Sequence, residues 1–115
     1  MNREEAFSAL ARCRDEIDAV DVRIVDLLNQ RTRVVEEIGR IKRHLALPIY
    51  EPKREDEVYR NITECNSGPL PAEALKRVFE RIIDEMRTVQ KLRMQQQMSA
   101  GGEAADREGR EKESC

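Results

Sequence analysis

The chain has 115 residues, of which 38% are charged and 3% aromatic, and its formal net charge is −2. This composition is typical of a single small domain of the helical, charge-rich type. Cations alternate with carboxylates instead of forming a basic face, which argues against nucleic-acid binding. The amino terminus lacks the regions of a signal peptide, no apolar run reaches membrane-spanning length, and the three cysteines show no paired spacing, so we expect a cytoplasmic protein that contacts no membrane.

A first helix is predicted from about residue 3 to about residue 44. Asn2 and Glu5 form a capping-box pattern, and no proline occurs before Pro48. Such a helix would be roughly 60 Å long. Its apolar residues recur in alternating steps of three and four, which predicts a continuous stripe on one face. We call this stripe the seam, and it consists of Leu10, Cys13, Ile17, Val20, Ile24, Leu27, Arg31, Val34, Ile38, Ile41 and Leu45.

Arg31 is the charged residue of the seam. Burying its guanidinium without water would cost several kcal/mol unless an anion compensates for it. Lys42 lies about three helical turns further along nearly the same face, so both cations can converge on one small ligand with several negative charges. The alternative is a facing glutamate that pairs with Arg31 and no ligand. Arg14 also flanks the seam, but roughly 42 Å separate it from Lys42, so one small ligand cannot contact both within a single chain.

Two shorter helices and a tail follow. Pro52 suits the first position of a second helix, after a turn around Pro48. The run NSGPLP breaks the chain, and a third helix begins at Pro71 and fades among the glutamines at 95–97. Residues 98–115 lack apolar periodicity, which predicts a disordered charged tail after a helical domain of residues 1–97. The expected apolar faces comprise Val58, Ile62 and Cys65 in the second helix and Leu75, Val78, Phe79, Ile82, Met86 and Val89 in the third.

Two short helices leave much of the seam exposed in a monomer, because the first helix is far longer than either. A second copy of the chain would cover it. In a two-fold dimer with antiparallel long helices, Arg14 of one chain reaches the site that holds Arg31 and Lys42 of the other. The pattern therefore predicts an all-α homodimer with two identical sites shared between the chains.

Three segments of the chain, in this order, resemble a known family. They are CRDEIDAVDVRIVDLLNQRTRVVEEIGRIK, PIYEPKRE and FERIIDEMRTVQ, and the resemblance extends over about residues 7–92. The family is the all-helical class of chorismate mutase. The resemblance implies an intertwined homodimer with three helices per chain. It further implies an isomerase that converts chorismate to prephenate, on the route to phenylalanine and tyrosine, without cofactor or metal.

The resemblance also implies which residues perform the reaction. Arg31 and the other chain's Arg14 would clamp the two carboxylates of chorismate, a bidentate task that suits guanidinium groups. Lys42 and Gln90 would donate hydrogen bonds to the ether oxygen of the breaking C–O bond. Because the reaction is a pericyclic rearrangement, the protein needs only to hold the reactive conformer and to stabilise the charge that grows on this oxygen.

Four further substrate-binding residues follow from the resemblance. Glu55 would accept a hydrogen bond from the ring hydroxyl, with Glu51 beside it, and Arg54 would support the positive field of the site. Glu51 replaces an aspartate of some relatives. Met86 stands where relatives often carry a small hydroxyl residue, so one expected hydrogen bond to a carboxylate is in question.

Each residue alone also has a structural explanation, because a cation such as Lys42 at a helix end or a carboxylate such as Glu55 at a helix start favours the helix dipole. Two other functions are compatible with parts of the sequence. Isochorismate-pyruvate lyase of the same fold shares the equivalents of Arg14, Arg31, Lys42 and Gln90, whereas the segment PIYEPKRE resembles a mutase. A non-catalytic helical dimerisation or adaptor module would explain the long helix, but a buried arginine contributes little to a structural seam.

No domain for sensing phenylalanine or tyrosine is expected, and an enzyme of the shikimate pathway is a possible regulatory partner.

Overall fold

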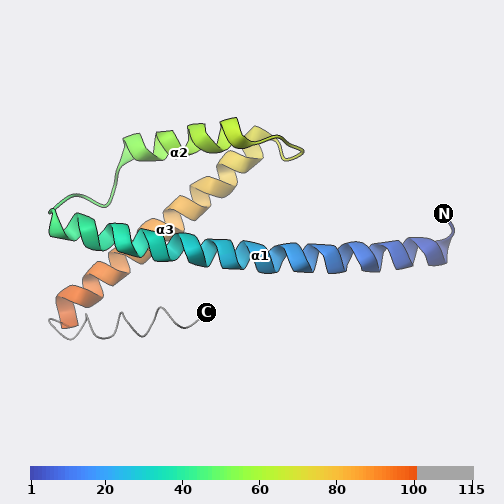
Figure 1. The fold of residues 1–115 in the computed structure, drawn as a ribbon, viewed down its shortest axis with the longest axis horizontal. Helices are drawn as coiled ribbons and strands as arrows, with labels where there is room; N and C mark the ends of the chain where they lie inside the picture. Colours follow the sequence, from blue (N-terminus) through green and yellow to red (C-terminus); the bar gives the residue numbers. More distant parts are fainter. Residues whose placement is uncertain (101–115) are drawn as a thin grey trace. The chain divides into compact units, whose positions relative to one another are not determined.

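The computed structural model describes residues 1–100, with side chains through Gln96. It contains α1 (Arg3–His44), α2 (Pro52–Cys65) and α3 (Ala72–Ala100), and no strand occurs within this range (Figure 1). The predicted all-α class and the order of three helices are confirmed. Helix α3 begins one residue after Pro71 and continues to Ala100, past the predicted end among the glutamines. The rest of the predicted tail lies outside the described residues.

The chain divides into two compact units after Arg31. The first unit holds the amino-terminal part of α1, and its start agrees with the predicted cap. The Oδ1 atom of Asn2 accepts a hydrogen bond from the backbone N–H of Glu5 at 2.8 Å, and the Asn2 carbonyl accepts one from the N–H of Ala6 at 2.9 Å. Asn2 thereby satisfies two of the N–H groups that a helix start leaves without an intrahelical partner.

The second unit contains the end of α1, which closes in a Schellman turn. The backbone N–H of Leu47 donates to the carbonyl of Lys42 at 2.8 Å, and that of Ala46 donates to the carbonyl of Arg43 at 3.2 Å. These two hydrogen bonds define the motif. Ala46 occupies its left-handed position, with a φ of 56°, where glycine is the usual residue. The turn reverses the chain so that the segment before α2 returns to α1.

Helix α3 packs on a face of α1 that lies beside the seam. Thr32, Val35 and Gly39 of α1 contact α3 side chains, and the Nε atom of Arg93 lies 2.7 Å from a carboxylate oxygen of Glu36. The apolar residues of the seam are therefore left uncovered: Ile17 is 62% exposed in the first unit and Val34 is 59% exposed in the second. The expectation that one chain leaves much of its seam exposed is confirmed.

The buried face of α3 differs in phase from the predicted stripe. Ile83 and Met86 are the buried apolar residues of the described part of the chain, whereas Val78 is 51% exposed. The expected stripe thus placed Val78 wrongly and missed Ile83. The reason is that α3 contacts both α1 and α2. The side of α3 that these two helices cover follows a row of residues spaced by three or four positions. That row is Leu75, Phe79, Ile83, Met86 and Gln90.

We predict that Ala46→Gly raises the free energy of unfolding by about 1 kcal/mol, because glycine adopts the left-handed conformation without the steric cost that alanine has. Chemical denaturation at a fixed protein concentration measures the change. The control is Ala11→Gly at an exposed position inside α1, which should lower the same free energy by about 1 kcal/mol. A comparable loss at both positions would show that Ala46 does not cap α1 in this conformation.

Candidate active site

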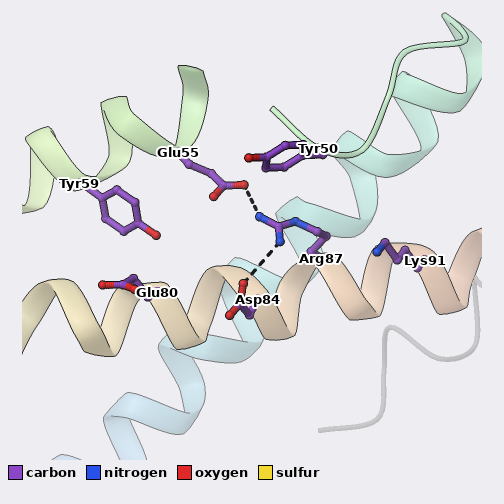
Figure 2. Close-up of a pocket in the computed structure, with 7 residues that line it drawn as sticks. All are labelled: Tyr50, Glu55, Tyr59, Glu80, Asp84, Arg87 and Lys91. Atoms are coloured by element: carbon purple, nitrogen blue, oxygen red, sulfur yellow. Dashed lines mark hydrogen bonds and ion pairs between the residues drawn. The ribbon is translucent and has the colours of Figure 1, made fainter. Parts of the chain in front are cut away.

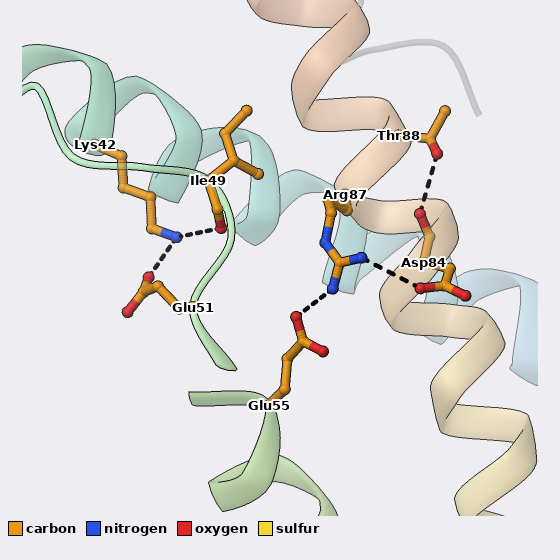
Figure 3. A network of polar contacts seen from close by, with 7 residues as sticks. All are labelled: Lys42, Ile49, Glu51, Glu55, Asp84, Arg87 and Thr88. Carbon is orange, nitrogen blue, oxygen red and sulfur yellow. Dashed lines mark hydrogen bonds and ion pairs between the residues drawn. The ribbon is translucent and has the colours of Figure 1, made fainter. Parts of the chain in front are cut away.

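Two polar side chains are buried in the described part of the chain, Lys42 of α1 and Gln90 of α3, and each residue is 8% exposed. A buried ammonium needs hydrogen-bond acceptors and a negative charge nearby. The Nζ atom of Lys42 donates to the Ile49 carbonyl at 3.0 Å and forms an ion pair with the Glu51 carboxylate (Figure 3). The structure therefore brings together two residues that the sequence had singled out, Lys42 and Glu51.

Gln90 lies against the part of α1 that belongs to the second unit. Its Nε2 atom donates to the Val35 carbonyl at 3.2 Å. A Cβ atom built on Gly39 would lie 3.7 Å from the Cγ atom of Gln90, an ordinary van der Waals distance, so the Gln90 side chain lies directly beside Gly39. Gly39 precedes Lys42 by one helical turn on the same face. Gln90 thus belongs to the contact of α1 with α3. Lys42, the other expected hydrogen-bond donor, lies on α1 one turn after Gly39, and its hydrogen-bond and ion-pair partners belong to the segment before α2.

Met86 extends this contact by one turn of α3. It is buried, and its sulfur accepts a hydrogen bond from the Thr32 hydroxyl at 3.3 Å. The hydroxyl group near this position therefore comes from α1 rather than from residue 86 itself. Thr32 was not among the predicted site residues, although its spacing from Val35 and Gly39 places it on one helical face with them.

Glu55 lies on α2 and pairs with a residue that sequence analysis did not select. Its carboxylate forms an ion pair with the Arg87 guanidinium, and both side chains are largely covered, at 22% and 25% exposure (Figure 2). The Nη1 atom of Arg87 also lies 3.4 Å from Oδ1 of Asp84, and its Cζ atom lies 4.9 Å from the centre of the Tyr50 ring. The pairing of Arg87 with Asp84, three positions earlier on the same helix, could be read from the sequence. The contacts of Arg87 with Glu55 and Tyr50 depend on the tertiary fold.

An open groove of about 500 Å³ lies beside this ion pair, between α2 and α3 (Figure 2). Burial, followed by the negative charges of Glu80 and Glu55, raises the pKa of Tyr59, so its phenol stays protonated at neutral pH and can donate a hydrogen bond. Glu55 is the one predicted site residue among those that line the groove, which are Tyr50, Glu55, Tyr59, Glu80, Asp84, Arg87 and Lys91.

The three predicted arginines take no part in the contacts described above. Arg54 is exposed on α2, where its Nη1 atom lies 3.7 Å from an oxygen of Glu57. Arg14 is exposed and Arg31 is half-buried, and both belong to the first unit. The described second unit therefore holds Lys42, Gln90 and the carboxylates, and the proposed carboxylate clamp depends on residues outside it.

Histidine, cysteine, aspartate and glutamate side chains do not gather in threes as metal ligands would, within the part of the chain that the structure describes. None of the described helices combines the length and the apolar character that a membrane-spanning segment requires.

The chorismate mutase type II family matches residues 13–91 of the chain. A bifunctional chorismate mutase/prephenate dehydratase of Aquifex aeolicus is 37% identical over 86 residues, which cover 71% of this chain and 24% of that protein. The chain spans 21% to 24% of the length of three such bifunctional relatives.

Solved structures resemble the chain along most of their own length. A chorismate mutase of Thermus thermophilus (form II) has a TM-score of 0.71 and 37% identity, and the match covers 72% of this chain and 94% of that one. A chorismate mutase of Helicobacter pylori, solved in complex with prephenate, has a TM-score of 0.68 and 33% identity, with coverage of 73% and 91%.

Proposed function

Because the chain belongs to the chorismate mutase type II family, we propose that it is an isomerase that rearranges chorismate to prephenate in phenylalanine and tyrosine biosynthesis. The observation that carries the proposal is the burial of Lys42 and Gln90, the two hydrogen-bond donors expected at the ether oxygen. A pericyclic rearrangement needs neither a nucleophile nor an acid or base, so donors held in fixed positions suffice.

The contacts of both donors leave N–H groups for a ligand. The Lys42 ammonium has three N–H groups, and the Ile49 carbonyl and the Glu51 carboxylate account for two of them. The Gln90 amide has two, and the Val35 carbonyl accounts for one. One donor from each side chain can therefore meet the ether oxygen as negative charge develops on it.

The remaining roles concern the ends of the substrate. Arg31 and the partner subunit's Arg14 bind the two carboxylates of the substrate, and Glu55 accepts a hydrogen bond from the ring hydroxyl. The contacts of Glu51 favour a role in holding Lys42 rather than direct contact with the hydroxyl. Arg54 contributes to the positive field near the start of α2.

A second copy of the chain completes this site. The exposed apolar residues of the seam favour an intertwined homodimer, since a large uncovered apolar face marks an interaction surface. The dimer supplies Arg14 from the other subunit. The free thiols of Cys13 and Cys65, both exposed, favour a reducing compartment and hence the cytoplasm.

The direct test adds purified protein separately to chorismate and to isochorismate. We expect chorismate to be consumed with formation of prephenate, and isochorismate to release little pyruvate by comparison. Pyruvate as the main product would instead indicate a lyase. If neither prephenate nor pyruvate forms, a non-catalytic dimerisation module is the explanation.

Gln90→Glu should confine activity to acidic conditions. An amide donates to the ether oxygen at any pH, whereas a glutamate donates only when protonated, and its ordinary pKa is about 4.3. We expect the variant to be at least about tenfold more active near pH 4.5 than at pH 7. The matched control is Gln95→Glu at an exposed position of α3, which should keep the wild-type pH profile. Full activity of Gln90→Glu at neutral pH would show that Gln90 does not donate a hydrogen bond to the ether oxygen.

The shared site predicts complementation between two inactive variants. Arg14→Ala and Lys42→Ala should each lower activity about a hundredfold, because each removes a charged contact from both sites. In a mixed dimer, one site is wild type at both positions and the other lacks both. After random exchange at equal amounts, roughly a quarter of all sites should regain activity.

The mixture is prepared by co-refolding, and a tag on one chain confirms subunit exchange. Arg12→Ala at a neighbouring exposed position of α1 serves as the control, and its homodimer should keep near wild-type activity. If exchange occurs and the mixture of the two impaired variants is no more active than either alone, Arg14 serves its own chain and the intertwined site is wrong.

A further inference from the structure

Arg87 has no role in the proposed chemistry, yet groups from three segments hold its guanidinium. Glu55 of α2 pairs with it, Asp84 lies one turn before it on α3, and the Tyr50 ring comes from the segment before α2 (Figures 2 and 3). On the assumption of the mutase function proposed above, we propose that Arg87 is a positioning residue that holds the Glu55 carboxylate in place to accept the substrate hydroxyl.

The position of Arg87 on α3 suits this role. Met86 and Gln90 face α1, and a residue one step after Met86 points about 100° further around the helix, where Arg87 meets α2. Arg87 therefore connects the buried edge of the site to the helix that carries Glu55.

The start of α2 is held at two carboxylates, one turn apart. Lys42 of α1 pairs with Glu51, and Arg87 of α3 pairs with Glu55, while the Glu55 N–H donates to the Glu51 carbonyl at 3.1 Å (Figure 3). Two cations from two different helices thus fix the first turn of α2. This arrangement defines where the Glu55 carboxylate lies relative to the other site residues of the second unit.

Glu55 needs such a partner because its side chain has three rotatable bonds and the helix dipole does not select among its rotamers. The ion pair with Arg87 uses Oε2 of Glu55. A carboxylate has two oxygens and about four acceptor positions, so a hydroxyl can bind while Arg87 stays in place. The Tyr50 ring adds a cation–π contact to the guanidinium, whose Cζ atom lies 4.9 Å from the ring centre.

A purely structural ion pair would behave differently. Partly exposed pairs contribute little to stability, so removal of Arg87 should leave the protein folded. A positioning role instead predicts an effect on substrate binding that depends on Glu55, and a double-mutant cycle on kinetics separates the two explanations.

The cycle compares wild type, Arg87→Met, Glu55→Gln and the double variant with chorismate as substrate, with thermal unfolding followed for each. We expect Arg87→Met to lower kcat/KM about tenfold, mainly through KM, and to change the Glu55→Gln enzyme less than about twofold. Arg87→Lys should recover part of the loss, because it keeps the charge without the planar fork. Tyr50→Leu, which frees the guanidinium without touching Glu55, should raise KM in the same direction.

Arg81→Met is the matched control, because Arg81 lies on the same helix and pairs at 3.0 Å with Glu85 while 79% of its side chain is exposed. It should leave kcat/KM unchanged. The positioning role would be overturned if Arg87→Met lowered kcat/KM equally in the wild-type and Glu55→Gln backgrounds. It would also be overturned if Arg87→Met left kcat/KM of the wild-type background unchanged. An inactive wild type would overturn the proposed function itself, whereas an active enzyme that needs Glu55 but not Arg87 would overturn this inference alone.

Discussion

The buried ammonium of Lys42 constrains the connection of α1 to α2. A charge at 8% exposure cannot stay without acceptors, so the chain after α1 has to return to it. The left-handed Ala46 makes that return, and the Ile49 carbonyl and the Glu51 carboxylate meet the Nζ atom as a result. Glu51 also occupies the N-cap position of α2, where its backbone carbonyl accepts the hydrogen bond of the Glu55 N–H and its side chain makes no capping hydrogen bond. One cation on α1 thus binds the residue from which the second helix begins.

The same logic continues from α2 to α3. Glu55 follows Glu51 by one turn and meets Arg87, and Gln90 lies one turn after Arg87 and binds the α1 backbone at Val35. Each polar group is oriented by a partner before any ligand is bound. Donors oriented in this way stabilise developing charge without having to reorganise during the reaction, which is what a rearrangement without a nucleophile requires of its enzyme.

The helices were predictable because their signals are local. The Asn2 cap and the prolines at 52 and 71 act within one turn, and they mark the helix starts to within a residue. Ala46 was not predictable as a left-handed residue, since glycine is the usual signal for that conformation. The exposure of Val78 and the burial of Ile83 depend on which two helices α3 contacts, and a single helical period cannot show that.

The site was predictable in part, and for a different reason. By itself, Lys42 looks like a solvated cation at a helix end. Its spacing from Arg31 made it a candidate ligand contact and the resemblance gave it a role at the ether oxygen, but neither predicted its burial. Arg87 carries no such signal, because one arginine in a charged helix looks like many others and its partners lie on other segments. Tertiary contacts decide its role.

The exposed seam ties assembly to chemistry in the proposed enzyme. Apolar residues and Arg14 lie on the same long helix, so in the proposed homodimer the contact that removes the seam from water would also carry Arg14, the proposed carboxylate-binding residue, to a second chain. Any sequence change that weakened the dimer would then remove a catalytic charge as well. In the proposed dimer, this coupling would let a small chain with few buried side chains support a site for a multiply charged substrate, because the second copy would provide apolar burial and positive charge through one surface.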